Sequence, residues 1–302
     1  MTLKNKEVLV TGAGGFIGSH LTEKLVNLGA NVTALTNIGE INYNFLNKIH
    51  TIQYDIRDKK LRGQIKDYEL IFHLAALTNR NEAIKEPEKA FDINTFGTIN
   101  ILEGCKNSKI KGLIYLSTAG VYGIPTYFPI NEEHPTTPLD PYSASKLSGE
   151  NAVLSYSSIY KFPATILRGF NVYGPKQNND FVIPKIIDHI LNKNEVILGN
   201  IDSTRDFIYI DDFVDGIMMA AECGGQKIYN LGSGVEISIK NVAEKVRALA
   251  CKENIIKTKD YGKSGILRSV ADISKIKKET GWKPKINLED GLMKTLNYYK
   301  SH

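Results

Sequence analysis

The chain is short of cysteines, of long apolar runs and of like-charged blocks, and each shortage excludes a class of protein. Its 302 residues include 3 cysteines, and Cys105, Cys223 and Cys251 stand too far apart for a disulfide framework or a paired zinc spacing. No apolar run approaches the roughly 18–20 residues of a membrane-spanning helix. The 38 basic and 33 acidic residues are interspersed, so the net charge of +5 predicts no nucleic-acid-binding tail. It suits an anionic small molecule instead.

Histidine is scarce as well. The 6 histidines include no H-x-x-x-H pair, and we expect His73, in an apolar strand, to pack in the core with a satisfied hydrogen bond. We therefore expect no metal site. The first expected strand begins within a few residues of Met1, which leaves no room for a secretory signal peptide. Together with the unpaired cysteines, this predicts a cytoplasmic protein with neither a membrane nor a nucleic-acid partner.

Glycines are concentrated where the chain leaves its first apolar strand. The run Val8–Gly18 reads VLVTGAGGFIG, and a helical pattern follows it. Gly12 allows a tight turn, Gly15 lets the backbone approach a pyrophosphate, and Gly18 lets the helix pack close to the sheet. The helix N-terminus then points free N–H groups at the phosphates. A flexible turn is the alternative, but the strand before the run and the helix after it favour a dinucleotide site.

In the first half of the chain, apolar runs alternate with segments of helical periodicity. This order predicts a Rossmann-type α/β fold, a doubly wound parallel sheet with helices on both faces. Strands are expected at residues 6–11, 31–36, 50–54, 69–74, 112–117 and 163–168. Helices are expected at residues 16–28, 81–106 and 141–160.

After about residue 170 the pattern loosens, and loops rich in Gly, Asn and Asp separate shorter elements. These elements are expected near residues 181–192, 211–222, 238–250 and 289–299. We predict a dinucleotide-binding domain over residues 1–170, with returning segments from about 205–235, and a smaller α/β region over 171–302 that mainly binds the substrate. A ligand cleft is expected at the carboxyl edge of the sheet, where open α/β sheets bind their substrates.

A second chemical signal is the Tyr-x-x-x-Lys pair of Tyr142 and Lys146, which begins an expected helix. A spacing of four places the phenol and the ammonium on one helix face, one turn apart. A nearby cation stabilises a phenolate and draws its pKa down from the ordinary value of about 10, and the same lysine can donate to a nicotinamide ribose. Chance placement on one helix face is the alternative, and the pair alone does not decide between the two.

A third signal favours a functional Tyr–Lys pair over chance placement. The strand residues Leu113 to Leu116 lead into Ser117 and Thr118, so a hydroxyl follows the carboxyl end of a strand and points into the expected cleft. With the glycine run and the Tyr–Lys pair, the sequence resembles the extended short-chain dehydrogenase/reductase family, and within it the NAD-dependent nucleotide-sugar epimerases and dehydratases. The resemblance covers nearly the whole chain and continues through residues 55–58, 73–76, 94–98, 167–175, 204–208, 268–272 and 281–284.

The resemblance implies a role for individual residues. Tyr142 matches the acid/base on a sugar hydroxyl, Thr118 shares the hydrogen bond to that sugar oxygen, and Lys146 orients the cofactor. Asp55 and Ile56 hold the adenine, the carboxylate accepting from the exocyclic amine. The further contacts implied for NAD are Gly12, Gly15, Phe16, Ile17, Gly18, Thr36, Asn37, Leu74, Ala75, Ala76, Asn94, Tyr142 and Lys146.

The resemblance also implies contacts to the substrate. Three of them match residues that bind the diphosphate of a sugar nucleotide, and arginine suits those oxygens because its planar fork donates in pairs. The substrate contacts are Thr78, Thr118, Asn171, Arg205 and Arg268, the last three on the diphosphate.

The chain departs from the family pattern at two places. Thr36 stands where an acidic residue normally ends the second strand, so nothing there repels the 2′-phosphate of NADP. No Arg or Lys occurs between residues 36 and 47 to bind that phosphate, which favours NAD and leaves NADP open. Gly169 stands where relatives often carry an aromatic residue, and it leaves room beside the reacting sugar for a group that the sequence does not identify.

The reaction type depends on the residues after Thr118. In the 4,6-dehydratases of the family an Asp-Glu pair there supplies the acid and the base, whereas Ala119 and Gly120 move no proton. The remaining residues support hydride removal from C4 and its return to the opposite face. We therefore expect a 4-epimerase of UDP-glucose and UDP-galactose or of their N-acetyl forms. A nucleotide keto-sugar reductase that uses NAD(P)H is the alternative, and a non-catalytic dinucleotide-sensing protein is a remote one.

Finally, the resemblance implies a homodimer. In relatives, the helices that match residues 81–106 and 141–160 pair with their copies as a four-helix interface, which is an isologous contact. Apolar residues on these helices exceed what one sheet face needs. They include Ile84, Phe91, Ile101, Ala152, Leu154 and Tyr156.

Overall fold

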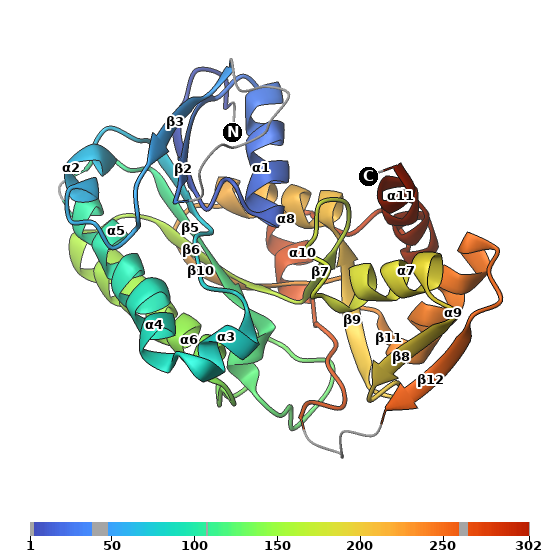
Figure 1. Cartoon of the computed structure of the whole chain (residues 1–302). Coiled ribbons are helices and arrows are strands. Elements are labelled where there is room, and N and C mark those ends of the chain that lie inside the picture. Colours follow the sequence, from blue (N-terminus) through green and yellow to red (C-terminus); the bar gives the residue numbers. More distant parts are fainter. Residues whose placement is uncertain (1–2, 38–47, 107, 260–264, 302) are drawn as a thin grey trace. The chain divides into compact units, whose positions relative to one another are not determined.

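Figure 1 shows the computed structural model of the chain, which describes residues 3–37, 48–106, 108–259 and 265–301. The chain divides into two compact units. The first unit comprises Met1–Gly123, Pro135–Arg168 and Ile217–Tyr229, and the second comprises Ile124–His134, Gly169–Gly216 and Asn230–His302. One stretch before residue 170 thus belongs to the second unit, and the segment that returns to the first is shorter than residues 205–235.

A seven-stranded sheet forms the centre of the first unit, in the order β10-β6-β5-β4-β1-β2-β3. Its strands are β1 (Glu7–Thr11), β2 (Asn31–Thr36), β3 (His50–Gln53), β4 (Leu70–His73), β5 (Gly112–Thr118), β6 (Ala164–Gly169) and β10 (Gln226–Leu231). β1 pairs in parallel with both β2 and β4, so the strand order reverses between β1 and β4. Open α/β sheets bind their ligands at the carboxyl ends of the strands beside such a reversal. The predicted doubly wound fold is confirmed.

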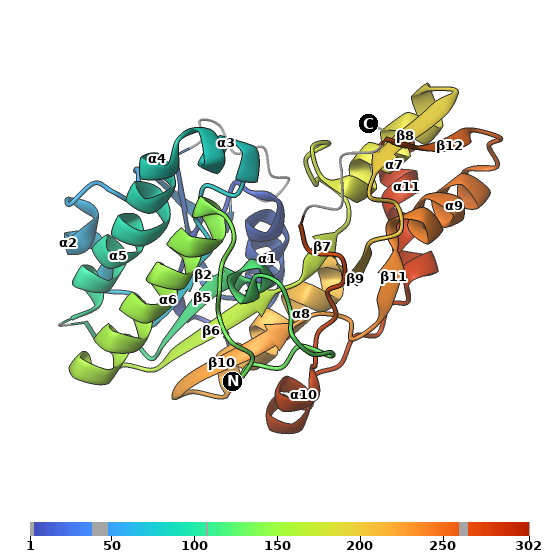
Figure 2. The ribbon, with the colours of Figure 1, turned by 90° about the horizontal axis from the view of Figure 1, so that it is seen from below.

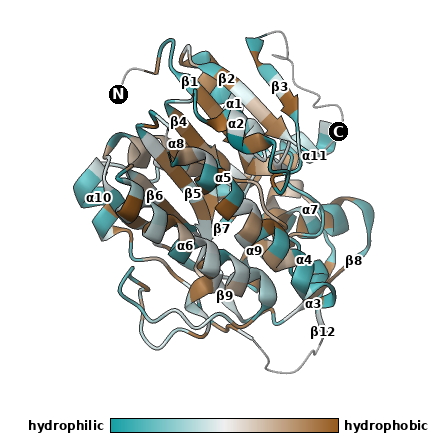
Figure 3. Ribbon diagram, turned by 90° about the vertical axis from the view of Figure 1, so that its left-hand side faces the viewer, coloured by the Kyte–Doolittle hydropathy of each residue, from teal (hydrophilic) through white to brown (hydrophobic). Residues whose placement is uncertain are grey.

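Both faces of the sheet are covered by helices because alternate strand residues point to opposite faces. Leu9, Ile71 and Leu113 belong to one buried cluster. The helices that pack on this cluster are α2 (Leu61–Ile65), α5 (Gly97–Cys105) and α6 (Pro141–Tyr160). Helix α1 (Phe16–Asn27) contacts β1 and β2 and lies on the opposite face (Figure 2). Figure 3 shows the apolar strands in brown between helices that carry hydrophilic residues in teal.

The helix predicted over residues 81–106 is wrong as a single element, since the structure divides it. The pieces are α3 (Arg80–Lys85), α4 (Pro87–Phe91), a π-helical turn (Asp92–Phe96) and α5. Pro87 has no N–H to continue the helix and begins a new one. Glu86, before it, has a non-helical backbone with φ −128° and ψ 67°. Helices with a π turn often contribute a residue to a functional site at that turn.

The second unit consists of small sheets and helices. One sheet has the order β11-β9-β7, and the other pairs β12 with β8 in parallel. The strands are β7 (Asn171–Tyr173), β8 (Glu195–Gly199), β9 (Thr204–Tyr209), β11 (Glu236–Ser238) and β12 (Ile255–Lys259). The helices are α7 (Val182–Asn192), α8 (Ile210–Glu222), α9 (Ile239–Ala250), α10 (Ser274–Thr280) and α11 (Leu288–Ser301), and α8 continues into the first unit.

A buried carboxylate ties β9 to two distant loops of the second unit. Asp206 is 0% exposed and accepts hydrogen bonds from the Ser233 N at 2.6 Å, the Ser233 Oγ at 2.7 Å and the Gly234 N at 2.8 Å. It also accepts from the Ala271 N at 3.1 Å. These donors compensate for the removal of the carboxylate from water.

In the part of the chain that the structure describes, no helix is long and apolar enough to cross a membrane. Among the same residues, no three His, Cys, Asp or Glu side chains gather as a metal ion would require.

Candidate active site

The glycine turn after β1 leaves space only for backbone. Gly12 has a φ of +69°, which glycine adopts without strain, and a Cβ there would lie 2.8 Å from the Ala75 N. A Cβ on Gly18 would overlap the Gly12 O, so α1 can start this close to the turn only with glycine at that position. Gly15 caps α1 without a side-chain hydrogen bond, which leaves the first N–H groups of the helix, from Phe16 onward, available to a pyrophosphate.

Behind this turn, a row of hydrogen bonds joins β1 to β4. The Thr11 Oγ1 lies 2.7 Å from the His73 Nδ1 and accepts from the Ala75 N at 3.1 Å. The Thr98 Oγ1 lies 2.9 Å from the His73 Nε2 and donates to the Asn94 O at 2.6 Å, so Nε2 carries the proton. Burial, assisted by a neighbouring ammonium, lowers the pKa of His73 to about 3. The prediction of a packed histidine with satisfied hydrogen bonds is confirmed.

Asn94, a predicted cofactor contact, holds the loop that follows β4. Its Oδ1 accepts from the Leu77 N at 2.7 Å, and its Nδ2 donates to the Leu77 O at 3.1 Å and to the Ser145 Oγ at 2.9 Å. The loop carries Leu74–Ala76, which are partly buried, and ends beside Thr78, which is exposed. Asn94 therefore fixes the position of the other predicted contacts in this loop.

The residues predicted to hold the adenosine lie at the ends of β2 and β3. Thr36 is 3% exposed, Asn37 is exposed, and Ile56 is buried. Arg57 donates to both oxygens of Asp55, from Nε to Oδ1 at 2.9 Å and from Nη2 to Oδ2 at 2.6 Å. These bonds lower the pKa of Asp55. Its carboxylate is thus charged and keeps lone pairs for a further donor such as an adenine amine.

Thr118 and Tyr142 form the predicted catalytic pair. Thr118 ends β5, and its Oγ1 accepts from the Gly120 N at 3.1 Å, which fixes the hydroxyl at the carboxyl end of the strand. Tyr142 lies in the first turn of α6, which Asp140 caps. Burial raises the pKa of Tyr142, while the positive charge of Arg80 and a hydrogen bond with Thr118 lower it. The structure thus brings the predicted pair together and adds Arg80, a cation that no sequence motif marks.

Lys146 lies one turn further along α6 and is 1% exposed. Its Nζ has no hydrogen-bond partner among the described residues and lies 4.1 Å from the centre of the Tyr115 ring. Burial lowers the pKa of Lys146 to about 7, against the opposing effect of the Glu150 carboxylate. A buried ammonium with unmet donors is costly, and the hydroxyl oxygens of a nicotinamide ribose would satisfy it. Together with the glycine turn, this buried donor fits NAD.

The lowered pKa of Lys146 predicts a pH dependence of stability. An ordinary lysine has a pKa of 10.5, so between about pH 7 and 10.5 the unfolded chain binds a proton that the folded chain releases. This residue therefore makes the protein more stable as the pH rises through that window. We expect cofactor-free Lys146→Met protein to have a larger free energy of unfolding than the wild type, by a difference that shrinks from pH 7 to pH 10.

Urea unfolding at several pH values measures this difference. Lys85→Met is the matched control, because it makes the same substitution at an exposed position. A difference for Lys146→Met that stays constant with pH would contradict the lowered pKa.

A buried ion pair lies behind Lys146. Glu150, one turn further along α6, is 1% exposed, and Arg168 in β6 is 5% exposed. Arg168 donates from Nη2 to the Glu150 Oε2 at 2.7 Å and from Nε to Oε1 at 3.1 Å, and the Ser117 hydroxyl donates to the same carboxylate. The pair joins α6 to β5 and β6. The sequence signal for it is a charged residue on the buried face of a helix, four residues after Lys146.

The predicted contacts to the substrate diphosphate lie in the second unit. Asn171 begins β7, and Arg205 lies in β9, in register with Ile237 of β11. Arg268 is exposed and donates from Nε and Nη2 to the two carboxylate oxygens of Glu236, at 2.8 and 2.7 Å. Both arginines thus belong to the same small sheet region of this unit.

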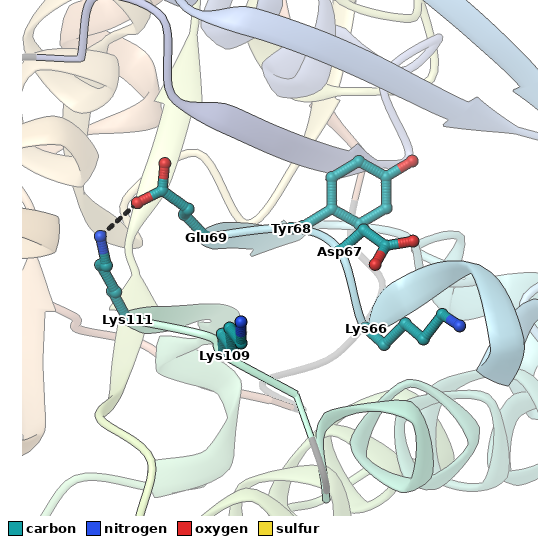
Figure 4. Close-up of a pocket in the computed structure, with 6 residues that line it drawn as sticks. All are labelled: Lys66, Asp67, Tyr68, Glu69, Lys109 and Lys111. Carbon is teal, nitrogen blue, oxygen red and sulfur yellow. Dashed lines mark hydrogen bonds and ion pairs between the residues drawn. The ribbon is translucent and has the colours of Figure 1, made fainter.

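A hollow in the first unit has no part in this site. Figure 4 shows Glu69 turned toward Lys111, with which it forms an ion pair. The lining residues precede β4 and β5, at the edge of the sheet opposite the glycine turn. They are Lys66, Asp67, Tyr68, Glu69, Lys109 and Lys111.

Comparisons with known proteins agree with the site. A family model described as GDP-mannose 4,6 dehydratase matches residues 9–295. A protein of Methanocaldococcus jannaschii with the provisional name UDP-glucose 4-epimerase is 36% identical over 98% of this chain and 99% of its own. The solved UDP-N-acetylglucosamine 4-epimerase from Methanobrevibacter ruminantium, in complex with UDP-N-acetylmuramic acid, is 32% identical, with a TM-score of 0.93 over 99% of each chain. The UDP-glucose 4-epimerase of Thermus thermophilus, solved with NAD, is 27% identical, with a TM-score of 0.89 over 97% of this chain and 99% of its own.

A glycine turn that fits a dinucleotide, on a doubly wound sheet with these structural relatives, defines an NAD-dependent enzyme of the extended short-chain dehydrogenase/reductase class. The chain belongs to the family described as GDP-mannose 4,6 dehydratase. Within it, the chain is an NAD-dependent nucleotide-sugar epimerase. The predicted family and cofactor are confirmed.

Proposed function

We propose that the chain is a 4-epimerase of UDP-glucose and UDP-galactose, or of their N-acetyl forms. The observation that supports this most is the lack of an acid or base after Thr118. Ala119 and Gly120 carry none, and a Cβ on Gly120 would displace the Ser143 Oγ and the Arg80 Nη2. The names of the Methanocaldococcus and Methanobrevibacter relatives support a UDP-linked sugar.

The chemistry at C4 is assigned to three residues of the first unit. Bound NAD supplies an acceptor for the hydrogen at C4 and the positive charge of its oxidised ring. Tyr142 removes the proton of the C4 hydroxyl as a general base and returns it as a general acid. Thr118 hydrogen-bonds the same sugar oxygen, and Lys146 donates to the ribose hydroxyls and so orients the nicotinamide. Burial favours the protonated phenol of Tyr142, so its base form depends on nearby positive charge.

Inversion requires the 4-keto sugar to turn over while its diphosphate stays bound. We assign the diphosphate to Asn171, Arg205 and Arg268, and the region over residues 171–302 mainly to the nucleotide sugar. Arginine suits this role because a planar guanidinium can donate two parallel N–H bonds to phosphate oxygens. Arg268 makes such a pair of bonds with the Glu236 carboxylate in this structure, so a diphosphate would replace or share that partner.

The decisive experiment runs the reaction in D2O. The purified protein is incubated without added cofactor with UDP-, dTDP-, GDP- and CDP-sugars, and the products are identified by NMR. We expect C4 epimers without deuterium at C5, because neither Ala119 nor Gly120 can remove the C5 proton. A 4-keto-6-deoxy sugar with deuterium at C5 would overturn the epimerase and the reductase alike, since another residue would then supply the acid and the base.

Thr36 supports one alternative, a nucleotide keto-sugar reductase that uses NADPH. The side chain is neutral and 3% exposed, so it repels no 2′-phosphate. A reductase consumes one reduced cofactor for each added keto sugar, whereas an epimerase consumes none. Loss of NADPH absorbance on addition of a 4-keto sugar nucleotide, without interconversion of C4 epimers, would establish the reductase. Bound NAD with no turnover of any sugar nucleotide would favour a non-catalytic dinucleotide-sensing protein.

We also propose a cytoplasmic homodimer that pairs through the helices between residues 80 and 106 and α6. Ile101 does not contribute, because it is 0% exposed in the core, whereas Ile84 is 59%, Phe96 62% and Ile159 68% exposed. We expect Phe96→Glu to convert the dimer to a monomer, since a charge would be buried in the interface. Leu28→Glu, at a residue of 48% exposure after α1, is the control. A wild-type monomer at every concentration by light scattering would contradict the proposal.

A further inference from the structure

Arg80 brings a guanidinium beside the catalytic pair. It begins α3, and its Nη2 lies 2.8 Å from the position of a Cβ on Gly120. Gly120 is the residue whose N–H donates to the Thr118 hydroxyl. Arg80 is also close enough to Tyr142 for its charge to lower the pKa of that phenol. The guanidinium therefore lies beside the backbone that holds the Thr118 hydroxyl and within electrostatic range of Tyr142.

Arg80 is held in place but not fully paired. Asn79 caps α3 by accepting from two backbone N–H groups of the helix, at 3.0 and 3.1 Å. The Arg80 Nε lies 3.6 Å from the Asp140 Oδ2, which is beyond hydrogen-bond distance. That carboxylate already accepts from the Ser143 N at 2.8 Å and from the Ser143 Oγ at 3.1 Å. The Arg80 side chain is 51% exposed, so its fork is accessible to a ligand.

The lack of a side chain at Gly120 keeps this fork open. An acidic side chain at that position would reach the Arg80 guanidinium and pair with it. Glycine leaves the Nη2 facing the space beside Thr118, with no acceptor from position 120. The first unit thus places an accessible positive charge beside Gly120.

We propose that Arg80 is a specificity-determining residue that binds a carboxylate on the sugar, next to the reacting carbon. This inference rests on the proposed function, which places O4 at Thr118 and Tyr142. The groups nearest the fork are then those on C3 and C5, the two ring carbons that neighbour C4. A carboxylate at C6 of a hexuronic acid, or on an ether at C3, would accept two parallel N–H bonds from a planar guanidinium.

A neutral hydroxymethyl group uses the same fork less well. It can accept a hydrogen bond, but it leaves the guanidinium with no charge partner among the described residues closer than the Asp140 carboxylate at 3.6 Å once the sugar displaces water. Hydrogen bonds between charged groups are about twice as strong as those between neutral groups. We therefore expect Arg80 to raise kcat/KM on an acidic sugar relative to its neutral counterpart by about 10- to 100-fold.

The experiment compares acidic and neutral sugars on matched variants. Wild type, Arg80→Met, Arg80→Lys and Lys85→Met, all loaded with NAD, are assayed on UDP-glucuronate against UDP-glucose, and on UDP-N-acetylmuramate against UDP-N-acetylglucosamine. Arg80→Met is expected to lower the ratio of acidic to neutral kcat/KM by about 10- to 100-fold. The ratio for Arg80→Lys should lie between those of the wild type and Arg80→Met, because lysine keeps the positive charge but not the planar pair of N–H donors. Lys85→Met removes a charge from the same helix and should leave the ratio unchanged.

The two sugar pairs distinguish the two sources of the carboxylate. If Arg80→Met lowers the acidic-to-neutral ratio only for UDP-glucuronate, the Arg80 guanidinium binds a carboxylate at C6. If the ratio falls only for UDP-N-acetylmuramate, the guanidinium binds a carboxylate on the ether at C3. An unchanged ratio for both pairs overturns the inference. The inference is also overturned if Arg80→Met lowers kcat equally on every sugar and shifts the pH profile upward. Arg80 would then act by stabilising the Tyr142 phenolate.

Equilibrium binding separates this inference from the proposed function. If the wild type turns over no sugar nucleotide, the epimerase proposal fails, but calorimetric titration of UDP-glucuronate and UDP-glucose into the NAD-loaded protein still tests Arg80. A weaker affinity of Arg80→Met for UDP-glucuronate alone supports the inference, and equal affinities of wild type and variant overturn it.

Discussion

Replacement of Tyr142 by phenylalanine is expected to lower turnover by about 10²- to 10⁴-fold, which is the usual contribution of a positioned acid/base group. We assign the proton transfer at the C4 hydroxyl to Tyr142, because Lys146 is assigned to the ribose and the hydroxyl of Thr118 is not a base. Phenylalanine keeps the ring and its packing, so the fold and the bound NAD should persist. NMR of the product sugars measures turnover, and the absorbance of cofactor released on denaturation measures the NAD content.

Tyr156→Phe provides a matched control on the same helix. The Tyr156 hydroxyl donates to the Glu103 Oε1 at 2.6 Å, away from the catalytic pair, so its loss should leave turnover near that of the wild type. A Tyr142→Phe variant that keeps more than about a tenth of the wild-type rate would remove Tyr142 from the role of acid and base.

Glu150→Gln is expected to lower the free energy of unfolding by about 3–5 kcal/mol, because it leaves Arg168 charged, buried and without its carboxylate. The Nη2 and Nε bonds of Arg168, at 2.7 and 3.1 Å, would lose their ionic partner. Glutamine fills the same space, so packing alone cannot account for such a loss. Urea denaturation followed by circular dichroism measures it.

The double variant Glu150→Gln/Arg168→Met isolates the cause. Removing both charges should restore much of the lost stability, since neither buried charge is then unpaired. If the double variant is less stable than Glu150→Gln by the full cost of the second substitution, the ion pair is not the source of the effect.

The sequence predicts well the parts of the fold that local chemistry determines. A helix over residues 141–160 is expected, and α6 has these bounds because Asp140 caps it and Lys161 ends it in a left-handed conformation. The helix over 81–106 fails at Pro87, where the apolar pattern continues but the backbone cannot. β10 is not predicted at all, because its sequence QKIYNL mixes polar and apolar residues and forms no apolar run.

The site residues likewise divide into those that local sequence predicts and those that it does not. The glycine turn and the Tyr142–Lys146 pair are short motifs whose spacing encodes their geometry, so sequence analysis finds them. Arg80 and Glu150 are not found, because their positions matter only through residues far along the chain. Arg80 acts beside Gly120 and Glu150 acts on Arg168, and no local periodicity reports either distance.

The position of β10 has a consequence for synthesis on the ribosome. β10 neighbours β6 at the edge of the sheet, and the Ala164 N donates to the Gly225 O at 3.0 Å just before β10 begins. Translation proceeds at about 5–20 residues per second, so β6 emerges several seconds before its neighbour exists. During that interval β6 (ATILRG), whose residues are mostly buried in the folded protein, is an unpaired edge strand of the nascent sheet. Such an edge is a template for intermolecular pairing. Expression yield should therefore respond to factors that shield nascent chains, and fragments that stop before residue 226 should aggregate.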